Sequence, residues 1–381
     1  MKKILTLISI VVFWCSLSSC GKKEVVFINW KKLEITGKVC DKSNWVSRSC
    51  DWNYVWWAAM NFAWNEMKEN ILKENVILDT KDKNVLELAK KFNNSIVTKN
   101  ILDEKSYYIK SGYGQKTVDL INKESKEKFP EKSFWPLNIW LGPNDIISYA
   151  YFYKKVEYKE PFNKKNITFK WRHYKWFEAI NSGKWFGEIV NQRENVKILN
   201  YENDDKFIVK LNLKDNSDEL ILVKGYDMDS PEQAINAINK YDKKDLEHLQ
   251  FNRYYQDYFE APNIKLDYHR GYESFLDKKL LNKVLEKQCL KDGLPKDCYK
   301  ISAMQEKIKF NMDNEWAKVE NEAFIWFFEV VSASVNEEEP DPIIRHFYLN
   351  DDYWIIMKRT DKKIPYFILW VKNDNLMEKA K

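Results

Sequence analysis

The chain has 381 residues and a formal net charge of +5, from 62 basic and 57 acidic residues. This near balance argues against a dedicated nucleic-acid-binding protein, because such domains carry a clear basic excess. Hydrophobic residues make up 44% of the chain and charged residues 31%, so it can bury a core and is not intrinsically disordered. Only 10 glycines and 4 histidines are present, which leaves few of the residues that common enzyme sites use.

The first twenty residues form a targeting segment. A basic start at Met1–Lys3 precedes the apolar run Ile4–Trp14 and then Leu17–Cys20. The apolar run is shorter than the roughly 20 residues that span a bilayer, but it suits a signal peptide. Its ending resembles a bacterial lipobox, which predicts cleavage after residue 19 and lipidation of Cys20. An ordinary secretory signal peptide is the alternative.

The targeting segment sets the expected domains and location. We predict a signal peptide over residues 1–19, a lipidated tether over 20–44, a folded domain over 45–373 and a tail over 374–381. The protein is then expected outside the cytoplasm in the cell envelope, anchored to the outer membrane or the cell surface through its lipid.

Four cysteines remain in the domain that export would deliver to an oxidising compartment: Cys40, Cys50, Cys289 and Cys298. Four cysteines allow three pairings, and the short spacings favour Cys40–Cys50 and Cys289–Cys298. A zinc site formed by all four is the competing interpretation, although their spacing is wider than a zinc knuckle.

Two helices and a strand are predicted in the first half of the chain. Residues 53–72 place apolar side chains on one helical face: Trp56, Met60, Ala63, Trp64 and Met67. Residues 117–126 form a shorter amphipathic helix, with Val118, Leu120 and Ile121 toward the core. Residues 146–153 are almost all apolar, which is typical of a strand buried on both faces.

The second half mixes strands and helices. Residues 209–223 predict a hairpin, and Ser230–Gln233 forms a capping box that starts a helix. Leu276, Leu280 and Val284 indicate another helix, residues 307–313 alternate as a strand, and residues 354–371 form a C-terminal hairpin. Because the elements lack βαβ regularity, the fold class is α+β.

No catalytic constellation is present. The sequence contains none of the nucleophile-elbow, P-loop, zincin or dinucleotide-binding motifs, and its histidines have no ligand spacing. We therefore expect neither an enzyme nor a cofactor or metal. The basic and aromatic segment Arg172–Trp176 suits nucleic acid or an anionic sugar, but a partly exposed strand explains it more simply.

Five segments together resemble the serpin family in order and spacing. They are Asp119–Lys123, Ser148–Phe162, Tyr201–Gly225, Ala261–Leu266 and Tyr353–Lys372. The second resembles the central strand 3A motif and the last resembles the final hairpin, whereas the serine-rich signature of helix B is missing. The resemblance implies a large mixed β-sheet A with sheets B and C, surrounding helices and an exposed reactive loop.

The resemblance also implies how such a loop works. A protease cuts it, and the loop then inserts as a new strand between strand 3A and strand 5A, here residues 307–312, which distorts the bound protease. Small residues must alternate in the inserted strand because one face becomes buried. Trp316 stands where glycine is usual, and the inward positions are occupied by Ala317, Val319, Asn321 and Ala323.

The usual loop length places the cut near Val330–Val331. We therefore expect a monomer that traps serine or cysteine proteases of apolar specificity, with a membrane contact through the lipid and no nucleic-acid partner. A serpin fold that no longer inhibits and works as a surface binding or structural protein is the alternative. An unrelated glycan-binding lipoprotein, suggested by Trp52, Trp56 and Trp57, is the third hypothesis.

Overall fold

The computed structural model describes most of the chain. The described residues are 37–39, 53–131, 136–169, 172–179, 181–182, 190–226, 231–241, 247–251, 255–320 and 343–380. The predicted signal peptide, Cys20, and the predicted pair Cys40 and Cys50 lie outside them. Among the described residues, no helix is long and apolar enough to span a membrane.

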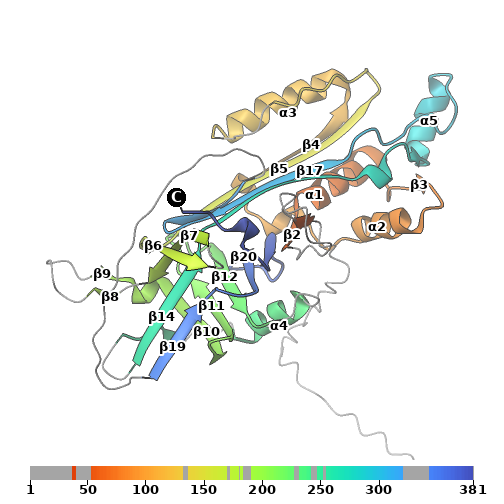
Figure 1. The fold of residues 1–381 in the computed structure, drawn as a ribbon. Helices are drawn as coiled ribbons and strands as arrows, with labels where there is room; N and C mark the ends of the chain where they lie inside the picture. The colour runs from red at the N-terminus through yellow and green to blue at the C-terminus, as the bar shows by residue number, and fades with distance from the viewer. Residues whose placement is uncertain are drawn as a thin grey trace, which may run out of the picture.

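An eight-stranded sheet forms the centre of the fold (Figure 1), in the order β1-β2-β21-β20-β12-β11-β10-β13. Its strands are β1 (Gly37–Val39), β2 (Asn53–Trp57), β10 (Val196–Asn203), β11 (Lys206–Leu211), β12 (Asp218–Lys224), β13 (Glu247–His248), β20 (Tyr353–Arg359) and β21 (Phe367–Val371). Both predicted hairpins are confirmed, since β11 pairs with β12 and β20 with β21. Every residue of β12 is buried, which fits its central place.

A five-stranded sheet extends from the middle of the fold to the end that carries α3 and α5 (Figure 1), in the order β15-β17-β18-β5-β4. Its strands are β4 (Tyr107–Tyr113), β5 (Ile146–Glu157), β15 (Ile264–Gly271), β17 (Gln305–Met312) and β18 (Trp316–Glu320). Each pair of neighbouring strands is antiparallel, whereas the resemblance implied a sheet that mixes parallel and antiparallel pairs. The reason is that β18 lies between β5 and β17, which would otherwise be parallel neighbours.

The parallel pairing occurs instead in a four-stranded sheet of order β19-β14-β7-β6. Its strands are β6 (Asn163–Phe169), β7 (Arg172–Ala179), β14 (Tyr255–Pro262) and β19 (Ile343–Tyr348). Two short pairs, β3 (Leu78–Asp79) with β16 (Lys279–Leu280) and β8 (Asn181–Ser182) with β9 (Val190–Asn191), complete the described sheets. The α+β class is confirmed.

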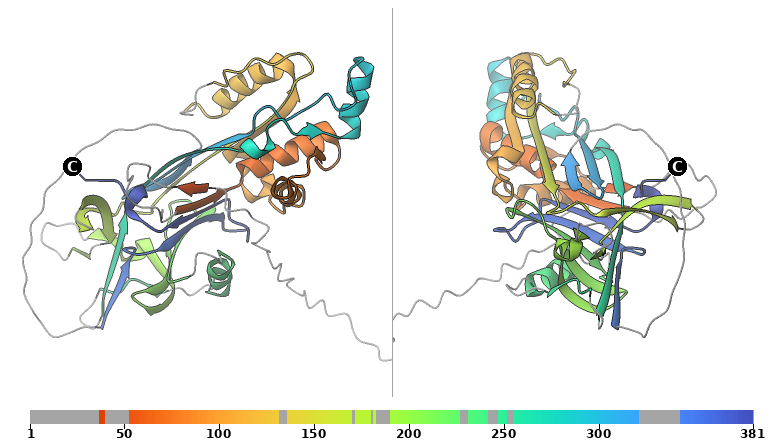
Figure 2. Two further views of the ribbon diagram at one scale, coloured as in Figure 1. Left: turned by 45° about the vertical axis from the view of Figure 1, so that its right-hand side comes forward. Right: turned by 90° about the vertical axis from the view of Figure 1, so that its left-hand side faces the viewer.

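The described helices are α1 (Ala59–Glu66), α2 (Lys83–Asn93), α3 (Gly114–Lys128), α4 (Pro231–Tyr241) and α5 (Lys283–Lys291). Figure 2 shows α3 and α5 on the same side of the fold, away from the four-stranded sheet. The helix α1 continues as a π-helical segment, Met67–Leu72. The principal core lies between the three large sheets, and a second core gathers around α1 and α2, where Trp64 stacks on Phe92 at 5.1 Å.

Three local predictions were wrong. The segment 53–57 is strand β2 rather than helix, because its aromatic and β-branched residues pair between β1 and β21 in the eight-stranded sheet. Leu276 and Leu280 precede the helix, which begins only at Lys283, because Asp277 has a left-handed φ of 59°. The first five residues of β5 are half-buried rather than buried on both faces, since this end of the sheet projects beyond the eight-stranded sheet.

Candidate functional site

The candidate site is the place where β18 enters the five-stranded sheet. Ala317 pairs with Val156 of β5 and Met312 of β17, and Val319 pairs with Lys154 and Phe310. The resemblance assigns β18 to the start of the reactive loop, β5 to strand 3A and β17 to strand 5A. β18 therefore lies between the two strands where the resemblance expects the loop to insert. Its five residues pair with Tyr153–Glu157 of β5 and Lys309–Met312 of β17, next to the turn from β17.

The side chains of β18 alternate between the core and the outer face of the sheet. Ala317 and Val319 are completely buried. Trp316 and Lys318 are half-buried on the other face, where the Lys155 ammonium lies 5.6 Å from the Trp316 ring. Because the indole lies outside, the bulk of Trp316 at this position requires no space in the core. Asn321, Ala323, Val330 and Val331 lie outside the described residues.

A tight turn joins β17 to β18. The Asp313 carboxylate accepts hydrogen bonds from the backbone N–H groups of Glu315 at 2.8 Å and Trp316 at 3.1 Å. The turn is also tied to neighbouring strands, because the backbone N–H of Phe162 donates to the carbonyl of Asn314 at 2.7 Å. Burial, together with the nearby Glu315, raises the pKa of Asp313 above its ordinary value of 3.8.

We expect Asp313→Asn to stabilise the protein at neutral pH. A raised carboxyl pKa means that the folded state binds the proton more tightly, so its stability falls as the pH rises from 3.8 through the raised value. Asparagine keeps the oxygen that accepts both N–H groups but removes the charge. The gain is at most about 1 kcal/mol, because solvent screens this partly exposed group. Urea unfolding measures it, and a gain that persists at pH 3 would contradict the assignment.

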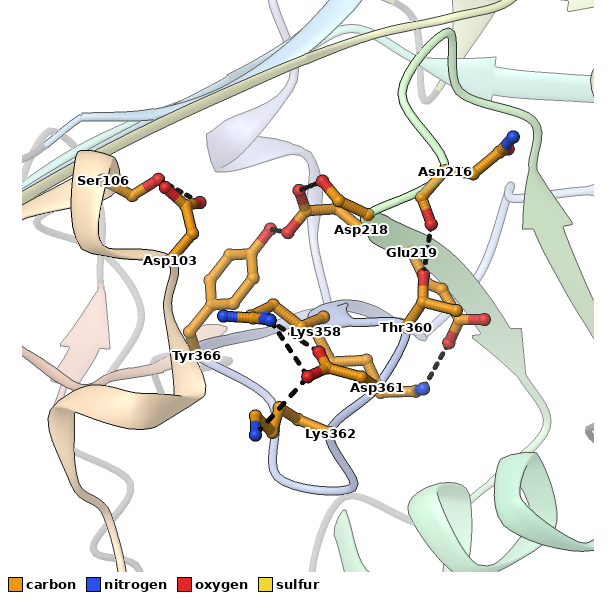
Figure 3. A network of polar contacts seen from close by, with 12 residues as sticks. Asp103, Ser106, Asn216, Asp218, Glu219, Lys358, Thr360, Asp361, Lys362 and Tyr366 are labelled. Atoms are coloured by element: carbon orange, nitrogen blue, oxygen red, sulfur yellow. Dashed lines mark hydrogen bonds and ion pairs between the residues drawn. The ribbon is translucent and has the colours of Figure 1, made fainter.

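A polar network lies beneath β18. The Lys154 Nζ atom on β5 is 2.7 Å from a carboxylate oxygen of Asp103 and 2.6 Å from one of Asp218, whose side chain is 1% exposed. The hydroxyl of Tyr366 donates to Asp218 at 3.2 Å (Figure 3). Since Asp218 belongs to β12 and Lys154 to β5, this network joins the five-stranded to the eight-stranded sheet.

The pKa values in this network follow from its ion pairs. Burial by itself disfavours the charges, but the hydrogen bonds from Lys154 and Ser106 hold the pKa of Asp103 below its ordinary value. In the same way, burial is outweighed at Lys154, whose two carboxylate partners raise its pKa. Both groups are therefore charged at neutral pH, and the network acts as a structural brace.

Two further contacts fix the strands that flank the site. The buried Glu306 carboxylate on β17 accepts from the backbone N–H of Met60 at 3.0 Å and from the Tyr272 hydroxyl, so it caps the start of α1. On β19, the Arg345 guanidinium donates to the fully buried Asp257 at 2.7 Å and 2.8 Å. These contacts hold β17, which pairs with β18, and β19, which follows residue 342 in sequence.

Sequence reasoning missed Lys154, Asp103 and Asp218. One signal was available for Lys154, because it interrupts the alternation of inward apolar residues between Phe152 and Val156. The partners lie far from it in sequence, on β12 and before β4, and no local pattern links them. The structure also joins Cys289 and Cys298 in a disulfide, the pair that the spacing favoured. No group of described residues could hold a metal ion.

No protein-family model matches the chain, and neither does any curated protein. Three solved structures are similar to it. Human kallistatin has 14% identity and a TM-score of 0.36 over 70% of this chain and 65% of its own, which is just under two thirds of that protein. Serpin48 of the insect Tenebrio molitor has 12% identity and a TM-score of 0.38, over 84% of this chain and 92% of its own. Human thyroxine-binding globulin has 13% identity and a TM-score of 0.37, over 77% and 82%.

These similarities are distant, so the fold assignment depends on the strand arrangement of the chain itself. β18 lies between β5 and β17, a four-stranded sheet begins directly after β5, and the C-terminal hairpin is central to the eight-stranded sheet. The sequence resemblance implied the first of these features and the C-terminal hairpin itself. The chain therefore has a serpin-like fold.

Proposed function

We propose that this serpin-like protein traps serine or cysteine proteases by cleavage and insertion of the loop that follows β18. One observation carries the proposal: the sheet already accepts Trp316–Glu320 between β5 and β17, with Ala317 and Val319 buried. Strand insertion is favourable because it pairs backbone groups and buries apolar surface. The apolar residues near Val330–Val331 favour proteases with apolar specificity pockets.

A protease panel tests the proposal. The chain from residue 21 is mixed with apolar-specific serine and cysteine proteases and separated on a denaturing gel. We expect a band at the summed mass that resists denaturation, and a peptide released by a cut near Val330. Clean cleavage with no such band, for every protease, would overturn the proposal.

The second candidate is a surface binding or structural protein with a serpin-like fold that does not inhibit. The presence of β18 in the sheet of the intact chain favours it, because part of the insertion has then occurred without cleavage. The two candidates differ in thermal stability after the loop is nicked. A gain of several degrees supports the trap, and no gain supports the second candidate.

We further propose that the protein acts in the cell envelope, held by lipid on Cys20. The support is the basic start, apolar run and small-residue ending of the leader. Incorporation of a labelled fatty acid by the native chain but not by a Cys20→Ser variant would support the anchor, and equal labelling would refute it.

A further inference from the structure

The outer face of β18 makes two contacts between a lysine and an aromatic ring of the neighbouring strand β5. Trp316 and Lys318 are half-buried on this face, which points away from the core. The Lys155 ammonium lies 5.6 Å from the centre of the Trp316 ring, and the Lys318 ammonium lies 5.0 Å from the centre of the Tyr153 ring. A cation within about 6 Å of a ring centre is attracted by the negative face of the ring.

Both contacts run diagonally across the pair of strands. Trp316 pairs with Glu157 and Lys318 pairs with Lys155, so each side chain of β18 reaches the residue that lies two positions before its own partner on β5. Diagonal neighbours on one face of a sheet are within reach of aromatic and long side chains. The two lysines are direct partners and would repel each other, but each ammonium lies over a different ring, Trp316 next to the turn and Tyr153 further from it.

The two residues of β5 are held in place by groups outside β18. The Lys155 Nζ atom lies 2.7 Å from one carboxylate oxygen of Glu157, and the other oxygen lies 3.1 Å from the Nζ atom of Lys214. The ring of Tyr153 packs 6.2 Å from the ring of Phe129, which follows α3. Because these partners already position the ammonium and the ring, contact with β18 loses little further side-chain entropy.

The two contacts together cover the length of β18. The turn before Trp316 is fixed by backbone hydrogen bonds from the segment that follows β5. At the other end, Lys318 contacts Tyr153, and Tyr153 pairs with Glu320, the last residue of β18. One contact therefore lies beside the fixed turn, and the other lies beside the end from which β18 would leave the sheet.

We propose that these two cation–π contacts form a latch that keeps β18 between β5 and β17 in the uncleaved chain. The latch consists of Trp316, Lys155, Lys318 and Tyr153. Glycine, which the resemblance expects in place of Trp316, has no ring to offer Lys155, so the bulky residue retains the strand instead of obstructing it. The consequence for trapping rests on the proposed function: insertion after a cut would extend a strand that already separates β5 from β17.

Hydrogen exchange of the β18 amides, followed by mass spectrometry, tests the latch without any protease. The chain from residue 21 keeps every described element, since the first begins at Gly37. Trp316→Ala and Lys155→Met should each raise the exchange rate of the amides of residues 317–320 about two- to fivefold, the effect of losing one cation–π contact at a partly exposed site. Since both substitutions remove the same contact, the double variant should exchange no faster than the faster single variant.

The second contact and two control variants complete the experiment. Lys318→Met should act like Trp316→Ala, and the two together should raise the rate about tenfold, because they remove separate contacts. Tyr153→Phe keeps the ring and removes only the hydroxyl, which donates to Glu131 at 3.3 Å, so the rate should change less than about twofold. Trp140→Ala removes a tryptophan that is 81% exposed and outside the latch, and it should leave the rate unchanged.

Three results would overturn the latch. The first is an unchanged exchange rate in Trp316→Ala. The second is a double variant of Trp316→Ala and Lys155→Met in which the two single effects multiply, because the side chains would then act independently. The third is an equal rise in the amides of β12, because the substitutions would then destabilise the whole fold. A chain that shows the latch but forms no denaturation-resistant protease complex would contradict the proposed function alone.

Discussion

Val319→Arg is expected to abolish the denaturation-resistant protease complex while the protein stays folded. Val319 is completely buried between Phe310 and Lys154. An arginine there would bring a second positive charge beside the Lys154 ammonium and leave it without a carboxylate of its own. Burying an unpaired charge costs several kcal/mol, so β18 should leave the sheet and the loop should no longer insert.

The matched control places the same side chain one residue away. Lys318 is half-buried on the outer face, so Lys318→Arg should preserve both the fold and the complex. Circular dichroism and thermal unfolding check that Val319→Arg remains folded. We expect that it does, because only the five residues of β18 are displaced. If Val319→Arg still formed the complex, the assignment of β18 as the insertable segment would be wrong.

The alternation of residues 316–320 was the part of the site that the sequence could predict. Side chains of a strand point alternately to opposite faces, so Ala317 and Val319 had to share one face whatever their partners. The same reasoning predicted β17, where Ile308, Phe310 and Met312 are all buried. It also predicted the C-terminal hairpin, since two apolar runs joined by a short polar turn pair locally.

Contacts between distant segments could not be predicted in this way. The segment 53–57 has apolar residues at positions that suit either a helix or a strand, and its pairing with β21 decides the outcome. Similarly, nothing near Lys154 indicates that Asp218 will lie beneath it. A charged residue at an inward strand position indicates that an oppositely charged partner lies nearby. The identity of that partner depends on how the two sheets pack, which the sequence around Lys154 does not show.

We expect Lys154→Met to cost about 3–5 kcal/mol of unfolding free energy, the usual cost of removing one partner from a buried ion pair. The substitution keeps the apolar stem but leaves Asp218, whose side chain is 1% exposed, without its ammonium partner 2.6 Å away. Urea unfolding at pH 7 measures the loss. The double variant Lys154→Met/Asp218→Asn should recover more than half of it, because the amide removes the stranded charge and still accepts from Tyr366. A double variant as unstable as Lys154→Met would show that the lost packing, not the charge, matters.

The pH dependence separates these two explanations further. The pKa of Asp103 is lowered in the folded state, so its stabilising contribution is present above 3.8 and is lost as the pH falls through the folded value. The pKa of Lys154 is raised, so its contribution is present below 10.5 and is lost at higher pH. The difference in stability between the wild type and Lys154→Met should therefore be largest between about pH 4 and pH 10. It should shrink on either side, whereas a loss of packing would give a difference that does not change with pH. These ion pairs hold β5 against β12 beside the position where Val319 pairs with Lys154. Removing them should therefore also weaken the pairing of β18 with β5.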